Sequence, residues 1–171
     1  MKKILLTGYM GSGKTTIALL LSKAAGISYY DLDEIIEEKA GKTISRLFAE
    51  DGEIKFRKLE HRALKEFMDT ESSFVLALGG GTPCYAGNHE FLRRDDVVSV
   101  YLKAGIPELV NRLREQDKHR PLVAGQGHDE LEEFIAKHLF DRSWFYHQAK
   151  HVVKVDGKLP QDIVNEIMSL Y

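Results

Sequence analysis

The sequence predicts an α/β protein in which helices cover both faces of a parallel sheet. Two observations lead to this class: short apolar runs alternate with amphipathic helical patterns, and glycine-rich turns directly follow two of the apolar runs. The length of 171 residues corresponds to about one domain. No repeat, low-complexity tract or Pro/Ser-rich linker divides the chain, so we expect a single domain over residues 1–171.

Five apolar runs are the predicted strands. The first is residues 4–6, and the clearest is residues 74–78, an unbroken apolar run typical of a strand buried on both faces. A weaker, tyrosine-rich strand is expected at 27–32, and two more at 97–102 and 152–155. Ligands in such sheets bind beyond the carboxyl ends of the strands, so we expect the functional residues to follow the strands directly.

Helical patterns lie between these strands. The first helix is expected to close at Gly26, because glycine readily adopts the left-handed conformation of a helix end. Its inward face is predicted to consist of Ile17, Leu20, Leu21 and Ala24. Further helices are expected at 106–115, where Pro107 suits the first turn, and at 160–170.

Two stretches interrupt the alternation. Residues 33–67 are predicted to be predominantly helical, with Thr43 at a helix start and Gly41 and Gly52 at helix ends. Their core stripe is predicted to be Phe56, Leu59, Ala63 and Phe67. Residues 115–129 are polar and show little apolar periodicity. A long loop of this kind is often an active-site lid, and a disordered surface loop is the alternative.

Charge and cysteine content bear on the class of partner. Lysine and arginine number 24 against 26 aspartates and glutamates, so no overall basic field favours nucleic acid or an anionic membrane surface. The longest apolar runs have five residues, far short of a membrane span. The single cysteine, Cys84, excludes an internal disulfide and suits a reducing compartment. We therefore expect a cytoplasmic protein that binds neither nucleic acid nor membranes.

Residues 8–15, GYMGSGKT, match the phosphate-binding motif G-x-x-x-x-G-K-[ST] in full, between a predicted strand and a predicted helix. The glycines let backbone N–H groups surround a phosphate, and the following helix presents its positive N-terminus to the same group. Lys14 is expected to reach the β- and γ-phosphates, and the Thr15 hydroxyl to bind Mg²⁺. The motif predicts nucleotide binding.

Carboxylates and glycines follow two further strands. Asp31 and Asp33 end the second strand, where one could hold water on Mg²⁺ and the other could orient or deprotonate an acceptor hydroxyl. Alternatively, Asp33 could cap the next helix. Gly79, Gly80 and Gly81 follow the third strand, which indicates that the backbone there must be bare or adopt positive φ. Close approach of a substrate or of the γ-phosphate is one explanation, and a tight turn is the other.

Three arginines are candidates for anion binding, although none stands out from the other arginines by more than a modest margin. Arg57 lies on a predicted helix with Glu53 and Glu60 at helical spacing, and a surface ion pair is the default interpretation. Arg120 lies in the predicted lid, where a mobile arginine could close over transferring phosphate. Arg142 could as easily be an ordinary exposed arginine.

Taken together, these motifs resemble the shikimate kinase family over essentially the whole chain. Beyond the phosphate-binding loop, they comprise D-x-D at 31–33, F-R at 56–57, G-G-G at 79–81, R-P-L at 120–122 and R-x-x-x-Y at 142–146. The loop alone is shared by many nucleotide-binding proteins, whereas the whole series is specific to this family.

The resemblance implies a fold, an activity and residue roles. The fold is that of a P-loop NTPase, three α/β/α layers with a five-stranded parallel sheet of order 2-3-1-4-5, a helical substrate-binding region at 33–61 and a mobile lid at 112–124. Family members transfer the γ-phosphoryl group of ATP, with Mg²⁺, to the 3-hydroxyl of shikimate, on the route to chorismate and the aromatic amino acids. By similarity, the shikimate-binding residues are Asp33, Arg57, Gly79, Gly80, Gly81 and Arg142. The ATP-binding residues are Gly11, Ser12, Gly13, Lys14, Thr15, Thr16, Arg112 and Arg120.

The same resemblance divides the catalytic roles. Lys14 and Arg120 neutralise charge on the transferred phosphoryl group, and Asp33 is the best candidate for the general base. Thr15 binds Mg²⁺ directly, with Asp31 behind it. Two alternatives stay open: a kinase for another hydroxylated acid such as gluconate, and a sensor that binds ATP and a small acid without transfer. We expect a monomer.

Overall fold

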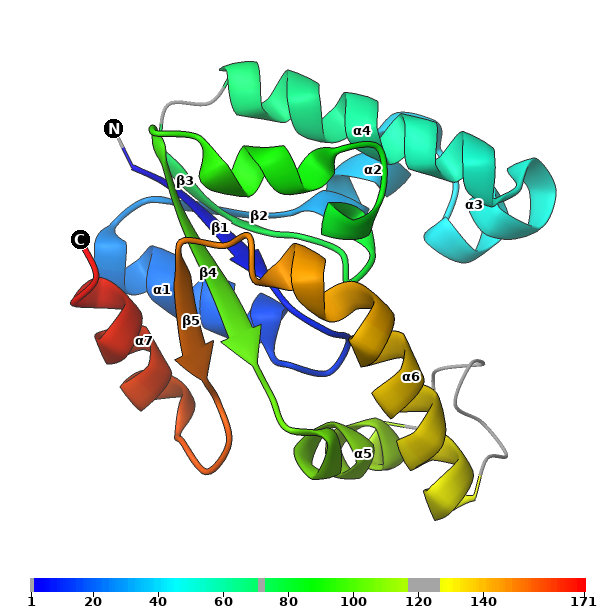
Figure 1. Cartoon of the computed structure of the whole chain (residues 1–171). Coiled ribbons are helices and arrows are strands. Elements are labelled where there is room, and N and C mark those ends of the chain that lie inside the picture. The colour runs from blue at the N-terminus through cyan, green and yellow to red at the C-terminus, as the bar shows by residue number, and fades with distance from the viewer. Residues whose placement is uncertain (1, 71–72, 117–126) are drawn as a thin grey trace.

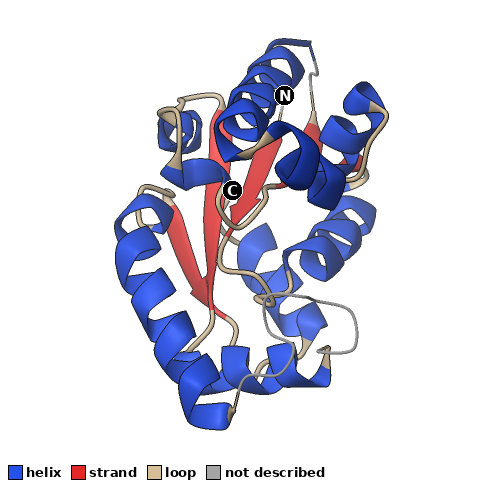
Figure 2. Cartoon of the chain, turned by 90° about the vertical axis from the view of Figure 1, so that its right-hand side faces the viewer, coloured by secondary structure: helices blue, strands red, loops and turns tan. Residues whose placement is uncertain are grey.

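The computed structural model describes residues 2–70, 73–116 and 127–171, and it has the α/β/α layers expected from the sequence (Figure 1). Helices α1 (Lys14–Ala25) and α7 (Pro160–Met168) pack together on one face of the sheet. The other face is covered by α4 (Glu53–Thr70), the 3₁₀ helix η2 (Asn88–Arg93) and the end of α6 (His128–Tyr146). Figure 2 shows the strands lying between these helical layers.

The sheet confirms the predicted topology. Its order is β2-β3-β1-β4-β5, and every neighbouring pair is parallel. The strands are β1 (Lys3–Thr7), β2 (Ser28–Asp31), β3 (Phe74–Ala77), β4 (Val97–Lys103) and β5 (His151–Lys154). All four residues of β3 are buried, as its unbroken apolar run predicts. The carboxyl ends of β1, β2 and β3 therefore meet at one edge, where the candidate motifs lie.

Helix α1 ends as predicted, but its inward face is rotated. Gly26 closes the helix with a φ of 66°. Ala18 and Ser22 are buried together with Ile17 and Leu21, whereas Ala24 is exposed and Leu20 is half-buried. The hydroxyl of Ser22 donates to the carbonyl of Leu19, so this polar side chain is satisfied inside the contact. The small side chains of Ala18 and Ser22 let α1 pack closely against its neighbours. A prediction based only on the large apolar residues of the helix does not identify these positions.

The stretch after β2 is helical, as expected. It forms α2 (Leu32–Ala40), α3 (Ile44–Asp51) and α4, and Gly41 and Gly52 lie at the ends of the first two. Thr43 caps α3 by accepting a hydrogen bond from the backbone N–H of Arg46 at 3.2 Å. In the predicted stripe of α4, Phe56 and Ala63 are buried, and Leu59 and Phe67 pack partly buried against the core. The expected strand at 27–32 is shorter because α2 already begins at Leu32.

Helix α5 (Ile106–Glu115) has the predicted bounds, whereas α6 was not predicted. The first residues of α6 fall inside the stretch that was expected to be a lid. That stretch has almost no apolar periodicity, so its sequence did not predict a helix. Residues 117–126 of the predicted lid lie outside the described residues. Within residues 2–70, 73–116 and 127–171, none of the helices has both the length and the apolar character that crossing a bilayer requires.

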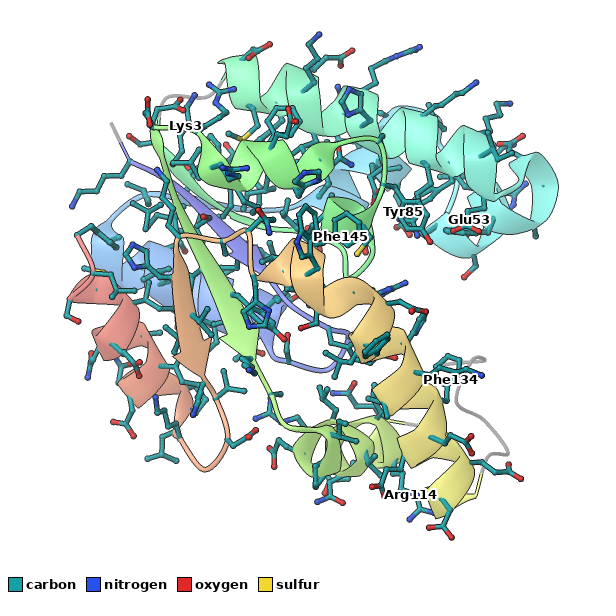
Figure 3. All side chains as sticks on the ribbon, viewed as in Figure 1. Lys3, Glu53, Tyr85, Arg114, Phe134 and Phe145 are labelled. Carbon is teal, nitrogen blue, oxygen red and sulfur yellow. The ribbon has the colours of Figure 1, made fainter. Side chains whose placement is uncertain are left out.

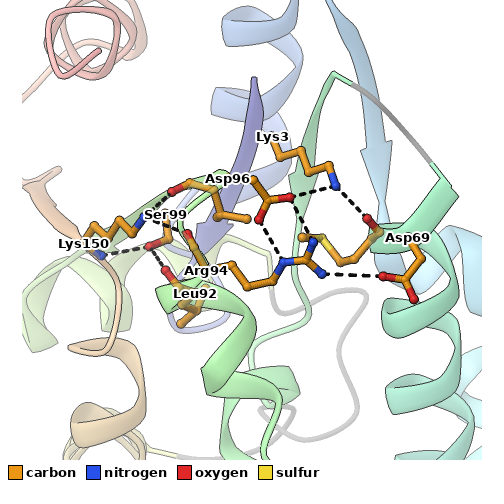
Figure 4. Close-up of polar contacts among 9 residues, drawn as sticks. Lys3, Asp69, Leu92, Arg94, Asp96, Ser99 and Lys150 are labelled. Atoms are coloured by element: carbon orange, nitrogen blue, oxygen red, sulfur yellow. Dashed lines mark hydrogen bonds and ion pairs between the residues drawn. The ribbon is translucent and has the colours of Figure 1, made fainter. Parts of the chain in front are cut away.

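A polar network ties the elements together at the edge opposite the motifs (Figure 4). Asp96, just before β4, accepts from Arg94 Nε at 2.9 Å and pairs with Lys3 Nζ of β1 at 3.0 Å. Hydrogen bonds from Arg94 and then Lys3 hold the pKa of Asp96 well below its usual range. Lys150, before β5, donates to the carbonyl of Arg94 at 2.7 Å. This network fixes the ends of three strands far from the candidate site.

Candidate active site

The phosphate-binding loop joins β1 to α1, and two glycines explain its path. Gly13 is the N-cap of α1 with a φ of 94°, a conformation that side chains rarely adopt. At Gly8, a Cβ would lie 2.7 Å from the carbonyl oxygen of Leu102 and 2.8 Å from Ser12 Oγ, so a larger residue would have no room. The loop therefore leads its backbone into the N-terminus of α1, as the motif predicts.

The ammonium group of Lys14 lies over this loop. Its Nζ donates to the carbonyl of Gly8 at 2.7 Å and to that of Tyr9 at 2.9 Å. The same Tyr9 carbonyl accepts from the N–H of Ser12 at 3.1 Å. The loop's carbonyls thus hold a cation at its mouth, where phosphate oxygens of a nucleotide would meet it.

A cleft of about 560 Å³ brings most of the predicted residues together. Its predicted lining comprises Gly11, Ser12, Gly13, Lys14, Thr15, Thr16, Asp31, Asp33, Gly79, Gly80 and Arg112. Gln116, Lys158 and Pro160 also line it, although no motif in the sequence predicts them as site residues. They lie at the end of α5 and around the start of α7, outside any motif, so only the fold reveals their position.

The two aspartates after β2 have distinct environments. Asp31 is the N-cap of α2: its Oδ1 accepts from the N–H of Asp33 at 2.9 Å, and its Oδ2 accepts from the hydroxyl of Thr15 at 3.2 Å. The alternative that Asp33 caps this helix is therefore wrong. Burial, followed by the negative charges of Asp31 and Glu60, raises the pKa of Asp33 to about 6, although Lys14 opposes the shift. Asp33 is thus a carboxylate with the basicity of a proton acceptor near neutral pH.

The glycine triplet does form a tight turn, as one alternative predicted: the N–H of Thr82 donates to the carbonyl of Gly79 at 3.1 Å. None of the three glycines has a positive φ, so close approach of other groups of the protein, and not backbone conformation, explains why they are glycines. A Cβ at Gly79 would lie 2.9 Å from Thr82 Oγ1 and 3.0 Å from Asp33 Oδ1. A Cβ at Gly81 would lie 2.7 Å from Arg57 Nη2. Because these glycines have no side chain, the carboxylate of Asp33 and the guanidinium of Arg57 can both contact the backbone of the triplet.

The middle glycine, Gly80, faces the phosphate-binding loop and α6. A Cβ there would lie 3.4 Å from the backbone nitrogen of Met10 and 3.6 Å from Arg142 Nη1. The carbonyl of Gly80 accepts from the Tyr146 hydroxyl at 2.6 Å. Tyr146 is fully buried, and burial raises its pKa, so the phenol remains a donor. The triplet is thus the point where the phosphate-binding loop, Arg57 and Arg142 meet.

Arg57 is not the surface ion pair that its helical setting suggests. Its side chain is only 14% exposed, and Nη1 donates to Glu60 Oε1 at 2.9 Å. Glu60 is itself buried, and its Oε2 accepts from the hydroxyl of Thr82 at 2.8 Å. The ring of Tyr85 lies 3.9 Å from the guanidinium carbon of Arg57. Glu60 lies three residues after Arg57 on the same helix face, so their spacing predicts the ion pair, whereas no signal in the sequence marks Tyr85.

The remaining predicted residues have different outcomes. Arg142 is half-buried on α6, with its guanidinium carbon 6.0 Å from the Tyr9 ring centroid, so the exposed interpretation is wrong. Arg112 donates to Glu108 Oε1 at 2.7 Å and to the carbonyl of Gly11 at 3.2 Å, which places it over the phosphate-binding loop. Arg120 lies outside the described residues.

Metal binding at the cleft would depend on few protein ligands. Across the described part of the chain, no group of three or more His, Cys, Asp or Glu side chains could hold a metal ion. The hydroxyl of Thr15 and the carboxylate of Asp31 are neighbouring oxygen donors at the foot of the phosphate-binding loop. One or two such oxygens suit Mg²⁺ that is carried mainly by nucleotide phosphates and water.

The family model and the curated relatives both indicate one family. A shikimate kinase family model matches residues 10–171. The shikimate kinase of Flavobacterium psychrophilum is 52% identical over 167 residues, which cover 98% of this chain and 97% of the relative. The shikimate kinase structure from Bacteroides thetaiotaomicron has a TM-score of 0.89 at 37% identity and covers 98% of this chain and 97% of that one. That of Acinetobacter baumannii, solved with shikimate, has a TM-score of 0.86 at 32% identity, with 98% and 91% covered.

Proposed function

The chain belongs to the shikimate kinase family and phosphorylates shikimate with ATP, and we propose that the site has two halves: a phosphoryl-binding half in the cleft, and an acid-binding half beside it, where Arg57, Gly81 and Arg142 lie outside the cleft's lining. One observation carries the division: the glycine triplet lies against Asp33 at Gly79, against Arg57 at Gly81, and against both Arg142 and the phosphate-binding loop at Gly80. A substrate lying along the triplet would present its carboxylate to the arginines and a hydroxyl to Asp33.

The acid-binding half consists of Arg57 and Arg142, with the backbone of Gly79, Gly80 and Gly81 between them. Guanidinium groups match a carboxylate through two parallel hydrogen bonds, which a lysine cannot reproduce. Both arginines are at least half-buried, so pairing with the acid takes place away from bulk water and is screened less by salt.

The phosphoryl-binding half consists of Gly11, Ser12, Gly13, Lys14, Thr15 and Thr16 at the start of α1, with Arg112 across the loop. Phosphoryl transfer requires mainly positioning and neutralisation of charge, and Lys14 supplies the cation closest to the loop. Arg120 lies outside the described residues, and its role on the same phosphoryl group rests on the family resemblance alone.

Asp33 is the proton acceptor in this proposal. The 3-hydroxyl oxygen of shikimate forms a bond to the γ-phosphorus as the bond to the bridging oxygen of ADP breaks, and the hydroxyl proton passes to a carboxylate oxygen of Asp33. The products are shikimate 3-phosphate and ADP. A pKa of about 6 leaves Asp33 ionised at neutral pH and more basic than an exposed aspartate.

Mg²⁺ fits the oxygen donors present. Thr15 would bind the ion directly, and Asp31, which already accepts from the Thr15 hydroxyl, would hold its water. When bound, Mg²⁺ supplies positive charge that offsets the negative charge of the β- and γ-phosphates.

We also propose a single kinase domain over residues 1–171, with the substrate-binding region at 33–61 and the lid at 112–124. One hydrophobic core runs through the described residues, which supports a single folding unit. The formal charge of −2 supports a small-molecule substrate rather than nucleic acid or a membrane surface, and the single cysteine supports a cytoplasmic location. A monomer completes this proposal.

Lysine substitutions test the acid-binding half. In Arg57→Lys and Arg142→Lys, the KM for shikimate should rise about tenfold or more, because a point charge cannot replace the guanidinium fork. The KM for ATP should change by less than about twofold. A change confined to the KM for ATP would show that neither arginine binds the carboxylate of shikimate.

A further inference from the structure

Arg57 is confined on several sides by groups from different elements. Glu60 holds Nη1, and Gly81 approaches both η-nitrogens so closely that a Cβ would overlap them. Glu53 lies 3.6 Å from Nε at the start of the same helix. The aromatic ring of Tyr85 covers the guanidinium, with 3.9 Å between the ring centroid and Cζ. Figure 3 shows Tyr85 and Glu53 on the side of the molecule where α4 begins.

The distance to Tyr85 distinguishes it from the other nearby rings. Phe56 and Phe48 lie 5.1 and 5.8 Å from the same guanidinium carbon, near the limit at which a cation and a ring attract each other. Tyr85 is in stacking contact, and it is 37% exposed, so it borders solvent beside Arg57. Its ring can therefore cover the arginine and still lie next to an entering acid.

The backbone after Tyr85 is held in a strained turn. The N–H of Asn88 donates to the carbonyl of Tyr85 at 3.0 Å, and the two residues between them have positive φ, 51° at Ala86 and 70° at Gly87. Ala86 is the one non-glycine residue with positive φ in the described part of the chain. Such a conformation persists only where surrounding contacts impose it, and it is concentrated at functional sites.

Those surrounding contacts lead back to Arg57. The side chain of Asn88 is buried, and its Nδ2 donates to the carbonyl of Thr82 at 3.0 Å. Its Oδ1 lies 2.7 Å from His61 Nδ1 on α4. The hydroxyl of Thr82 donates to Glu60, which also binds Arg57. The turn and the arginine thus share one buried hydrogen-bond network.

We propose that Tyr85 is a positioning residue for Arg57: its ring fixes the plane of the guanidinium in which the fork meets the substrate carboxylate. A bidentate pair needs the two groups to be coplanar, and a stacked ring restricts rotation of the guanidinium out of that plane. Residue 85 therefore sets the affinity for the acid and leaves the nucleotide site unaffected. This inference rests on the proposed contact between Arg57 and the carboxylate of shikimate.

The test compares Tyr85→Leu, Tyr85→Phe and Arg57→Lys, with Phe140→Leu as a control. Phe140 is an 85% exposed aromatic residue on α6, so its loss reports general effects of removing a surface ring. Steady-state assays give kcat and the KM values for shikimate and ATP, and competitive inhibition gives the Ki of the neutral carboxamide of shikimate. Tyr85→Met serves as a second ring-deleting variant if leucine lowers the melting temperature.

In Tyr85→Leu, the KM for shikimate should rise about tenfold, because an attraction between a cation and a partly desolvated ring is lost. The Ki of the carboxamide should rise much less, since this analogue has no carboxylate. Tyr85→Phe retains the ring face and should stay within about twofold of the parent. The kcat and the KM for ATP should be unchanged in all variants at residue 85. In the Arg57→Lys background, Tyr85→Leu should raise the KM for shikimate by less than about a further threefold, because the planar guanidinium is already absent.

Three results would overturn the inference. One is a KM for shikimate in Tyr85→Leu that stays within twofold of the parent while Arg57→Lys raises it, which would leave the proposed function intact. Another is an equal rise in the KM for shikimate and in the Ki of its carboxamide, which would show that Tyr85 has only a general packing role. The third is an unchanged KM for shikimate in Arg57→Lys, which would remove the acid contact and this inference together.

Discussion

The phenolic oxygen of Tyr9 lies 3.0 Å from Nδ1 of His138, and this contact joins the phosphate-binding loop to α6. The rings meet edge to face, with centroids 5.7 Å apart. Burial raises the pKa of Tyr9 to about 12, so its hydroxyl stays protonated in this contact. One helical turn further along α6 is Arg142, so the contact holds this part of α6 against the phosphate-binding loop.

This contact predicts a dependence of stability on pH. Burial and then the charge of Arg142 lower the pKa of His138, so the unfolded chain takes up this proton more readily than the folded chain. Stability from this group is therefore complete above the unfolded pKa of about 6.5 and is lost as the pH falls below it. In His138→Gln, which keeps an acceptor and does not titrate, melting temperatures from pH 7.5 to 5.5 should fall less steeply. Parallel curves for variant and parent would contradict the role of His138.

Asp33 predicts opposite effects on activity and stability. As the base, Asp33 must be ionised, so kcat/KM for shikimate should rise with pH through about 6. Asp33→Asn should lower kcat by about 10²-fold or more while leaving ATP affinity unchanged. Initial rates from pH 5 to 8 measure both effects. Full activity in the variant would exclude Asp33 as the proton acceptor.

The predicted effect of Asp33→Asn on stability follows from the raised pKa of Asp33. Folding disfavours its ionised form, so its contribution is full below the unfolded value of 3.8 and is lost as the pH rises through about 6. Asn at position 33 removes this penalty, and the variant should be more stable than the parent at pH 8, by about 1 kcal/mol. Thermal unfolding at pH 8 and pH 4 measures the difference, which should shrink at the lower pH. A variant that is less stable at both pH values would show that the carboxylate is not destabilised by folding.

Lys14 predicts a loss confined to transfer. Lys14→Ala removes the cation that the loop carbonyls hold, and kcat should fall by about 10³-fold. Lys23→Ala is the matched control, since Lys23 is exposed in the last turn of the same helix. Single-turnover phosphoryl transfer distinguishes the two variants. Activity of Lys14→Ala within tenfold of the parent would contradict this role.

The network at the far edge predicts a loss of stability without a loss of catalysis. Asp96→Asn weakens the contacts with Arg94 and Lys3, so the melting temperature should fall by a few degrees at pH 7. The ionised form of Asp96 is favoured by folding, so the difference from the parent should diminish as the pH falls below about 4. The kcat at 25 °C should match that of the parent, because the cleft lies at the other edge of the sheet. A reduced kcat with an unchanged melting temperature would refute this separation.

How much the sequence could predict depends on the range of the interactions involved. The phosphate-binding loop and the helix end at Gly26 follow from local conformational requirements, so residues 8–15 and α1 were predictable. Helix α6 was missed because its apolar residues show little asymmetry around the helix, although it carries Arg142. Of the groups around Arg57, Glu53 and Glu60 were predictable from their spacing on one helix. Tyr85 was missed because it is 28 positions away, and only the folded loop brings its ring onto the guanidinium.

ADP release from the purified protein with ATP and Mg²⁺, with shikimate, with gluconate and with neither, tests the central claim most directly. We expect rapid release with shikimate and release at the background rate of ATP hydrolysis in the other two reactions. Release driven by gluconate alone would mean that the acid site recognises another substrate. Tight ATP binding without release in any reaction would contradict the account and favour a sensor.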